Sequence, residues 1–314
     1  MDTQKLAFVF PGQGSQSVGM MSAYGEDAEI RRTFDEASAA LGEDLWDMAL
    51  NGPSERLSLT TNTQPLMLTA GVAVFRCWIA RTGRRPDMVA GHSLGEYAAL
   101  VAADVLALSD AVPLVRLRAR AMQDAVPAGT GAMAAVLGLD ADVVVACCRE
   151  AAGDEVVAAV NFNSPEQTVI AGHAEAVQRA MALLAARGAK RTVALPVSAP
   201  FHCSLMRPAA ERLAAALPAV EFRRPAIALI NNVDVASPSE PDAVRDALVR
   251  QAAAPVRWVE VIRRMAELGA GCVAECGPGK VLAGLTKRID RNLTGVALAD
   301  AASLEQLAQQ IGVE

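Results

Sequence analysis

Aromatic residues and histidines are scarce in this chain of 314 residues: phenylalanine, tryptophan and tyrosine together make up 4%, and there are three histidines. The core must therefore be built mainly from aliphatic side chains. The six cysteines include no C-x-x-C pair, and the histidines are too few and too scattered to complete a zinc site. We expect no bound metal, no resident cofactor, and reduced thiols that are mostly buried.

An excess of positive charge is also missing. The chain has 29 lysines and arginines against 35 acidic residues, for a net charge of −6, whereas nucleic-acid-binding proteins usually carry a basic excess. No stretch approaches the roughly 18 uninterrupted apolar residues that a membrane span needs. The N-terminal residues 1–14 show neither a basic leader nor a small-residue cleavage site. We expect a soluble cytoplasmic protein with neither nucleic acid nor membrane as a partner.

The most informative stretch runs from Pro86 to Leu108 and contains the pentad GHSLG, with Ser93 at its centre. A short apolar segment precedes the pentad and apolar residues at helical spacing follow it, which predicts a strand at 88–90, a tight turn, and a helix at 96–108. A serine in such a turn, with glycines two positions before and after it, is typical of a nucleophile elbow. Backbone N–H groups at the start of the helix would face a developing oxyanion. Ser93 is therefore the candidate nucleophile.

A glycine-rich loop also follows the first predicted strand. Leu6–Phe10 is a continuous apolar run, as in a strand buried on both faces, and the residues PGQGSQ at 11–16 come directly after it. The loop lacks both the Lys-Ser/Thr of a P-loop and the G-x-G-x-x-G spacing. Two interpretations stay open: a phosphate cradle, or a loop in which the backbone N–H of Gln13 contributes to an oxyanion hole.

Three arginines alternate along a predicted helix at 109–125, namely Arg116, Arg118 and Arg120. Residues two apart on a helix point about 200° apart, so the three cannot all face solvent equally. We expect one of them to point inward. Arg118 would then either form a structural ion pair or bind a carboxylate of the substrate with its planar guanidinium.

The pattern of elements changes after the flexible segment AGTG at 128–131. Predicted elements then follow in the order β-α-β-β-α-β, which is that of a ferredoxin-like subdomain. On either side of this segment strands and helices alternate, which predicts a mostly parallel sheet flanked by helices. We therefore predict an α/β fold in two parts: a hydrolase-like core formed by residues 1–128 and 198–314, and an inserted ferredoxin-like subdomain formed by residues 129–197.

A general base for Ser93 must come from a small number of residues. His92 adjoins the serine and should point away from it, and His173 lies in the inserted subdomain. His202, in the segment SAPFHCS between a predicted strand and a predicted helix, can project from a loop. A lone loop histidine is usually polar surface, but here it is the candidate base.

Seven motifs occur in a fixed order over nearly the whole chain: GQGSQ, GHSLGEY, RLRARAMQ, NSP, SAPFH, QAAAPVRW and ECGPGK. Together they resemble the malonyl-CoA:acyl carrier protein transacylases of fatty-acid synthesis. The resemblance implies that a malonyl group passes from malonyl-CoA to the phosphopantetheine thiol of an acyl carrier protein through a malonyl-serine intermediate. We expect the enzyme to act as a monomer.

The resemblance also implies the catalytic residues. Ser93 would be the nucleophile and His202 its base. The backbone carbonyl of Gln251, in place of the usual carboxylate, would hold the imidazole in the tautomer that accepts the serine proton. The backbone N–H groups of Gln13 and Leu94 would form the oxyanion hole.

Substrate contacts follow from the same resemblance. Arg118 would bind the free carboxylate of the malonyl group and so select diacid thioesters over acetyl-CoA. Phe201 would crowd the α-carbon and favour malonyl over methylmalonyl groups, and Asn163 would help to order the pocket. An acidic carrier protein needs a basic patch, for which the candidates are Lys287 and Arg288 with Lys280 and Arg291 near the end of the chain, and Lys190 and Arg191 at the edge of the inserted subdomain. A solvated helix face is the alternative interpretation of these charges.

Three rival functions share part of this pattern. An esterase or lipase has the same elbow but usually carries an acid between the serine and a late histidine. A scaffold of a synthase complex would form no acyl-serine. An acyltransferase that serves a polyketide synthase or a malonate decarboxylase would keep the chemistry and change the pathway.

Overall fold

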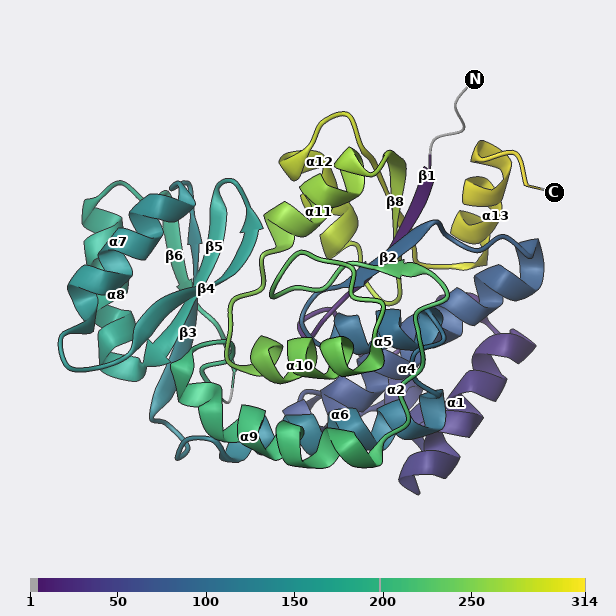
Figure 1. Ribbon diagram of the computed structural model, residues 1–314, viewed down its shortest axis with the longest axis horizontal. Coiled ribbons are helices and arrows are strands. Elements are labelled where there is room, and N and C mark those ends of the chain that lie inside the picture. Colours follow the sequence, from purple (N-terminus) through teal and green to yellow (C-terminus); the bar gives the residue numbers. More distant parts are fainter. Residues whose placement is uncertain (1–4, 198, 314) are drawn as a thin grey trace.

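The computed structural model describes residues 5–197 and 199–313, which form two separate sheets (Figure 1). The larger sheet is parallel throughout, with the strand order β7-β2-β1-β8-β9. Its strands are β1 (Lys5–Phe10), β2 (Met88–Gly91), β7 (Ala228–Leu229), β8 (Ala270–Cys276) and β9 (Thr294–Leu298).

Helices pack on both faces of this sheet. The helices of this part are α1 (Ala28–Leu41), α2 (Leu45–Asn51), α3 (Ser54–Leu57), α4 (Thr60–Thr82), α5 (Gly95–Ala102), α6 (Leu108–Asp124), α9 (Arg207–Ala216), α10 (Pro241–Ala252), α11 (Trp258–Glu267), α12 (Val281–Ile289) and α13 (Ala301–Gln310). Three short 3-10 turns also occur: η1 (Ser22–Tyr24) before α1, η2 (Ser204–Met206) directly before α9, and η3 (Leu217–Ala219) directly after it.

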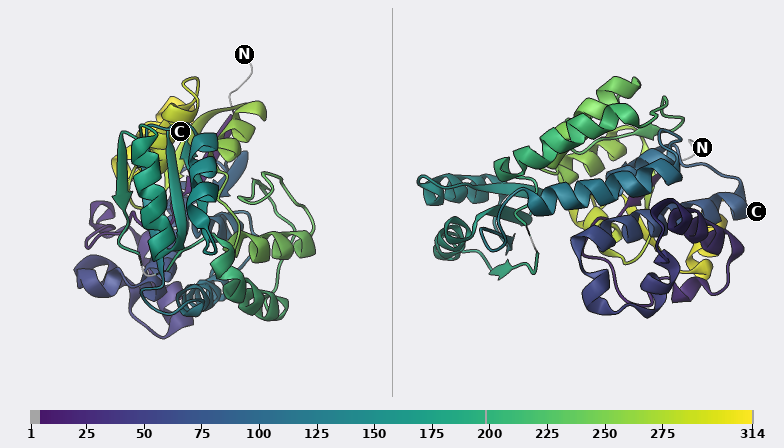
Figure 2. Two further views of the ribbon diagram at one scale, coloured as in Figure 1. Left: turned by 90° about the vertical axis from the view of Figure 1, so that its left-hand side faces the viewer. Right: turned by 90° about the horizontal axis from the view of Figure 1, so that it is seen from below.

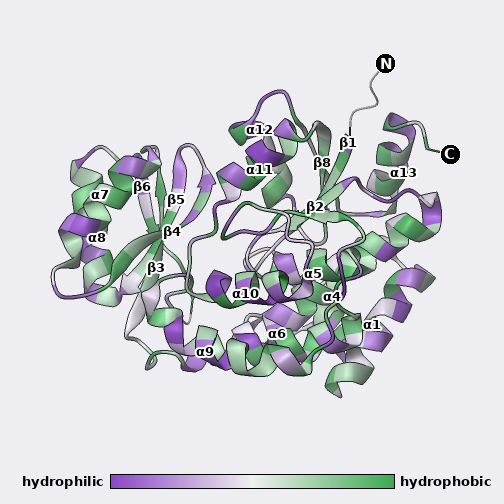
Figure 3. Ribbon diagram, viewed as in Figure 1, coloured by the Kyte–Doolittle hydropathy of each residue, from purple (hydrophilic) through white to green (hydrophobic). Residues whose placement is uncertain are grey.

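Alternation along β1 shows why both faces are covered. Phe8 and Phe10 point into the apolar cluster built with α4 and α5, whereas Ala7 and Val9 point into the cluster built with α11 and α12. Successive side chains of a strand face opposite sides, so a run without polar residues must be buried on both. The central strands are accordingly mostly hydrophobic in Figure 3.

The smaller sheet is antiparallel and lies to one side of the larger part (Figures 1 and 2). Its strand order is β4-β5-β3-β6, and two helices pack on it. The elements are β3 (Gly131–Leu137), α7 (Ala141–Ala152), β4 (Val157–Ser164), β5 (Gln167–His173), α8 (Ala174–Ala186) and β6 (Arg191–Ala194). The β-α-β-β-α-β order predicted from the sequence is confirmed. The exact division at 128/129 and 197/198 stays a prediction, and residue 198 lies outside the described residues.

The helix predicted after the elbow has different bounds in the structure. The helix expected at 96–108 ends at Ala102, and a turn with Asp104 at φ 61° leads into α6 at Leu108. Elsewhere, α4 begins at Thr60, and the hydroxyl of Thr63 in its first turn donates to the carbonyls of Leu57 and Leu59.

All six cysteines are free and buried. Five of them have a raised thiol pKa with burial as the largest cause, and for Cys148 the value is about 12. Over residues 5–197 and 199–313, no helix combines the length and the apolar character needed to cross a bilayer.

Candidate active site

Ser93 lies in a sharp turn between β2 and α5. Its backbone has φ 53°, a conformation that residues with a side chain adopt rarely. A Cβ atom on Gly91 would lie 1.9 Å from the backbone of Gly95, and one on Gly95 would lie 2.1 Å from the carbonyl oxygen of Phe10. Both flanking positions therefore require glycine, since any side chain would separate the turn, the helix and β1. The predicted elbow geometry is present.

His202 meets this serine from a loop 109 residues further along the chain. Its Nε2 lies 2.6 Å from Ser93 Oγ, and its Nδ1 lies 3.0 Å from the carbonyl oxygen of Gln251 and 3.2 Å from that of Ala254. Carbonyl oxygens only accept hydrogen bonds, so Nδ1 carries the proton and Nε2 accepts from the serine hydroxyl. His202 also has a positive φ of 65°.

The imidazole is neutral in this environment. Burial, and then the nearby positive charge of Arg118, lower the pKa of His202 to about 3. A neutral imidazole is the form that can take a proton from the serine, and the site holds it so across the physiological range.

Arg118 comes from α6 and points into the same place, with 2% of its surface exposed. Its Nη2 lies 3.2 Å from Ser93 Oγ and donates to Gln251 Oε1 at 3.1 Å, while its Nη1 donates to Gln64 Oε1 at 2.9 Å. The guanidinium lies over the ring of Tyr97, 5.4 Å from the centroid. Burial lowers the pKa of this arginine.

The two neighbouring arginines behave differently. Arg116 forms a bidentate ion pair with Glu43, at 2.8 and 3.0 Å, and Arg120 is exposed. Arg118 forms no ion pair with a carboxylate of the described residues, and its hydrogen bonds go to neutral oxygens, those of the two glutamine amides and of the serine hydroxyl. The ion-pair interpretation of Arg118 is therefore not supported.

A buried carboxylate that the sequence analysis did not single out lies behind the serine. Glu96, 1% exposed, accepts hydrogen bonds at Oε2 from the Asn232 backbone N–H at 2.9 Å and from Gln251 Nε2 at 3.1 Å. Burial raises its pKa to about 7. From the sequence, an acidic residue in the first turn of a helix indicates only that the helix begins favourably there.

The glycine-rich loop after β1 lies against the elbow. A Cβ atom on Gly12 would approach the His92 carbonyl oxygen to 2.7 Å, which places Gln13 beside the turn that carries Ser93. The side chain of Gln13 donates to Thr60 Oγ1 at 3.2 Å. Leu94 is the buried N-cap residue of α5.

The remaining predicted residues lie at three places. Asn163, at the end of β4, has its Oδ1 2.8 Å from Nε2 of His92, so the histidine does point away from the serine, toward the inserted subdomain. Phe201 is half-buried directly before His202, between the main apolar cluster and one in the smaller sheet. Lys287 and Arg288 are exposed in the last turn of α12.

Comparison with known proteins agrees with this geometry. The sequence model of the acyl transferase domain family matches residues 7–305. The malonyl CoA-acyl carrier protein transacylase of Escherichia coli K12 is 54% identical over 306 residues, covering 96% of this chain and 99% of that protein. The solved acyl-carrier-protein S-malonyltransferase of Burkholderia pseudomallei has a TM-score of 0.96 and 57% identity, over 97% and 99% of the two chains.

A further solved structure contains an acyl-carrier protein of a type II polyketide synthase together with its malonyl-transacylase. That chain has a TM-score of 0.96 and is 48% identical, with 98% of this chain and 99% of that chain covered. The family match and the identities over nearly the full length leave one assignment: the chain belongs to the acyl transferase domain family and, within it, to the malonyl CoA-acyl carrier protein transacylases.

Proposed function

We propose that this chain transfers a malonyl group from malonyl-CoA to the phosphopantetheine thiol of an acyl carrier protein, through a malonyl-serine intermediate. The observation that carries the proposal is the buried guanidinium of Arg118, 3.2 Å from Ser93 Oγ and without a carboxylate partner among the described residues. A cation in that environment favours an acyl group that ends in a carboxylate, because an uncharged acyl group leaves the charge unpaired.

In the first half-reaction, Ser93 Oγ attacks the thioester carbonyl and His202 Nε2 takes the hydroxyl proton. The carbon–sulfur bond breaks, and the CoA sulfur leaves with the proton that the imidazole returns. The 2.6 Å contact between Oγ and Nε2 supports this role, as do the two carbonyls, of Gln251 and Ala254, that hold Nδ1–H. Backbone carbonyls thus replace the carboxylate of a Ser-His-Asp triad.

The negative oxygen of the tetrahedral intermediate would be stabilised by the backbone N–H groups of Gln13 and Leu94. Two features support this assignment: the loop that carries Gln13 packs on the His92 carbonyl, and Leu94, directly after the nucleophile, is the N-cap residue of α5. The Ser93 N–H itself is engaged elsewhere, since it donates to Asn232 Oδ1 at 2.7 Å.

In the second half-reaction, His202 takes the proton of the phosphopantetheine thiol, and the sulfur attacks the malonyl ester. The bond to Ser93 Oγ breaks and the serine recovers its proton from the imidazole. Phe201, next to the base, would crowd a branched α-carbon and disfavour methylmalonyl groups. Asn163 would order the pocket through His92.

The acceptor is the carrier protein of fatty-acid synthesis in this proposal. Lys287 and Arg288 would meet its acidic surface. The likeness to a malonyl-transacylase in complex with a polyketide carrier protein favours one alternative acceptor of the same chemistry. We also propose a monomer in the cytoplasm without membrane or nucleic-acid partners, which the origin of Ser93, His202 and Arg118 in one chain and the net charge of −6 support.

The test is intact-mass analysis after incubation with malonyl-CoA, acetyl-CoA and methylmalonyl-CoA in separate reactions. We expect a malonyl adduct that is absent in Ser93→Ala and disappears when carrier protein with its phosphopantetheine arm is added. An adduct formed equally well from acetyl-CoA would contradict the role of Arg118. Fast hydrolysis of malonyl-CoA without an acceptor would instead make the chain an esterase.

A further inference from the structure

The buried side chain of Asn232 holds the nucleophile elbow at two points. This residue, 0% exposed, lies in the loop between β7 and α10. Its Oδ1 accepts the Ser93 N–H at 2.7 Å, and its Nδ2 donates to the Gly91 carbonyl, also at 2.7 Å. The two bonds clamp the backbone on either side of His92, which is the turn that presents the serine.

The elbow needs such a clamp because its backbone is strained. Ser93 has φ 53°, and residues with side chains keep this conformation only where surrounding contacts impose it. An N–H and a carbonyl on one side of the turn require one acceptor and one donor in the same plane. A carboxamide offers both; a carboxylate in its place would face the Gly91 carbonyl with a second acceptor.

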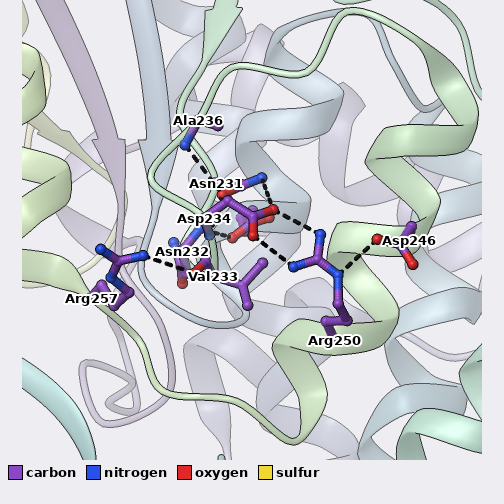
Figure 4. Close-up of polar contacts among 9 residues, drawn as sticks. Asn231, Asn232, Val233, Asp234, Ala236, Asp246, Arg250 and Arg257 are labelled. Carbon is purple, nitrogen blue, oxygen red and sulfur yellow. Dashed lines mark hydrogen bonds and ion pairs between the residues drawn. The ribbon is translucent and has the colours of Figure 1, made fainter.

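Asn232 is itself held by a network that includes the helix of Gln251. Its backbone N–H donates to Glu96 Oε2 at 2.9 Å. In the loop of residues 231–236, Asn231 Oδ1 accepts the Asp234 N–H at 2.9 Å. The Asp234 carboxylate pairs with both terminal nitrogens of Arg250, at 2.6 and 2.7 Å (Figure 4).

The second anchor of the loop comes from the segment after α10. Arg257 Nη1 donates to the Val233 carbonyl at 3.3 Å, and the Arg257 N–H donates to the Asn232 carbonyl, also at 3.3 Å (Figure 4). Arg250 directly precedes Gln251, whose carbonyl orients the base and whose Nε2 donates to the Ser93 carbonyl at 3.0 Å. One loop therefore links the backbone of the nucleophile to the helix that orients the base.

We propose that Asn232 is a positioning residue of the transfer reaction. Its carboxamide fixes the Ser93 backbone, and the Asp234–Arg250 pair holds the loop that carries Asn232 against α10. The proposal rests on the function proposed above. None of the contacts of the Asn232 side chain reaches Ser93 Oγ, His202 or Arg118. Its loss should therefore slow acylation and leave malonyl-CoA binding intact.

The test compares Asn232→Asp and Asn232→Ala with the parent enzyme in single-turnover acylation by malonyl-CoA. We expect the acylation rate constant to fall by about 10²-fold, the loss typical of a misplaced reacting group, at an unchanged KM. The matched control is Asn62→Asp, a buried asparagine whose Nδ2 donates to the Arg56 carbonyl at 2.9 Å, and it should acylate at the parent rate.

A pH profile separates positioning from a general loss of stability. Below its pKa, the carboxyl of Asn232→Asp regains an O–H donor for the Gly91 carbonyl, so its rate should recover toward the parent as the pH falls. Asn232→Ala should not recover. Glu96, His92 and His202 also face the elbow, and taking the ratio of the two variants at each pH removes their contribution.

Labelling of Ser93 by a fluorophosphonate probe makes the test independent of the donor. Slower labelling of the Asn232 variants supports the proposal even if malonyl-CoA is the wrong substrate. If Asn232→Ala does not fold, Arg250→Gln, which cuts an exposed pair, should still lower acylation by up to about fivefold. Folded Asn232 variants with parent acylation and labelling rates, or with a raised KM alone, would overturn the proposal.

Discussion

The two sheets of the molecule carry different kinds of side chain. Five described residues with a carboxyl, imidazole or guanidinium group are buried, and all of them belong to the part with the parallel sheet: Glu96, Arg116, Arg118, His202 and Glu275. Within residues 129–197 the charged side chains stay at the surface, as in the pairs Arg179–Glu155 and Arg187–Glu150. The buried charges of these types thus lie in the parallel part, and the smaller part provides packing and polar contacts.

The smaller part nevertheless meets the site at a defined place. The Phe162 N–H donates to the Val256 carbonyl at 3.0 Å, and the Val256 N–H donates to the Val160 carbonyl at 2.8 Å. Val256 lies two residues after Ala254, whose carbonyl accepts from His202. We therefore expect substitutions of buried charged residues in the parallel part to change activity or stability strongly. Substitutions of polar residues in the smaller part should change activity only slightly.

The largest effect should come from Arg118→Ala. Removing the cation that we propose as the partner of the malonyl carboxylate should lower kcat/KM for malonyl-CoA by about 10³-fold, or about 4 kcal/mol, and reduce the preference over acetyl-CoA. Arg116→Ala is the matched control, because that buried arginine already has a carboxylate partner in Glu43. Acylation rates with both donors measure the effect; an equal loss with malonyl-CoA and acetyl-CoA would refute it.

Glu96→Gln should change how stability depends on pH. Burial raises the pKa of Glu96 from 4.5 to about 7, so the folded state keeps a proton that the unfolded state has lost between these values. The advantage of the parent over the variant is complete below about pH 4.5 and should decline by up to about 3 kcal/mol as the pH rises through about 7.

Urea unfolding from about pH 5 to about pH 8 measures that difference. Glu43→Gln is the control. In the parent protein, hydrogen bonding to Arg116 lowers the pKa of the Glu43 carboxyl. Its contribution is lost only as the pH falls below the ordinary range of a glutamate, so this control should show no decline over the same interval. A flat difference for Glu96→Gln would show that the carboxylate is ionised in the fold at little cost.

Asn163→Ala removes the side-chain hydrogen bond between the smaller part and His92. A single neutral hydrogen bond is worth about 1 kcal/mol, so kcat/KM for malonyl-CoA should fall by about fivefold. Glu166→Ala, an exposed residue in the turn after β4, should have no effect on this constant. If Asn163→Ala lowered kcat/KM as much as Arg118→Ala does, the two parts of the molecule would not have the different roles described above.

The smallest effect should come from charge reversal at the surface. Replacing Lys287 and Arg288 with glutamate should raise the KM for carrier protein by about threefold per charge, more at low salt, and leave the KM for malonyl-CoA unchanged. The same change at Lys190 and Arg191 tests the smaller part as the docking surface. Equal shifts in both KM values would exclude docking through α12.

Features that depend on a local sequence pattern could be predicted correctly. The continuous apolar run 6–10 and the glycines at 91 and 95 predict a buried strand and a tight elbow, and both predictions are confirmed. Elimination among the three histidines made His202 the candidate base, and the alternation of arginines predicted that one of them points inward. The roles of His202 and Arg118 came from the resemblance to a family. Periodicity limits an arginine to a helix face and does not say what that face meets.

The supporting residues could not be predicted in this way. Glu96 follows the elbow like any acidic residue in a first helical turn, and Asn232 lies 139 residues from the serine that it holds. Their roles arise only when the loop after β7 packs on the elbow, and neither has a local signal. The same holds for Val256, which joins the two parts through backbone groups alone.

The burial of the six cysteines has a consequence for an enzyme that moves acyl groups between sulfur atoms. A thiolate at the surface would take the malonyl group from CoA by thioester exchange, or form a mixed disulfide with free CoA. Even Cys203, next to the base, is buried and donates its Sγ–H to the Pro200 carbonyl at 3.1 Å. The chain thus keeps its own sulfur out of the exchange, and the acyl group waits on an oxygen.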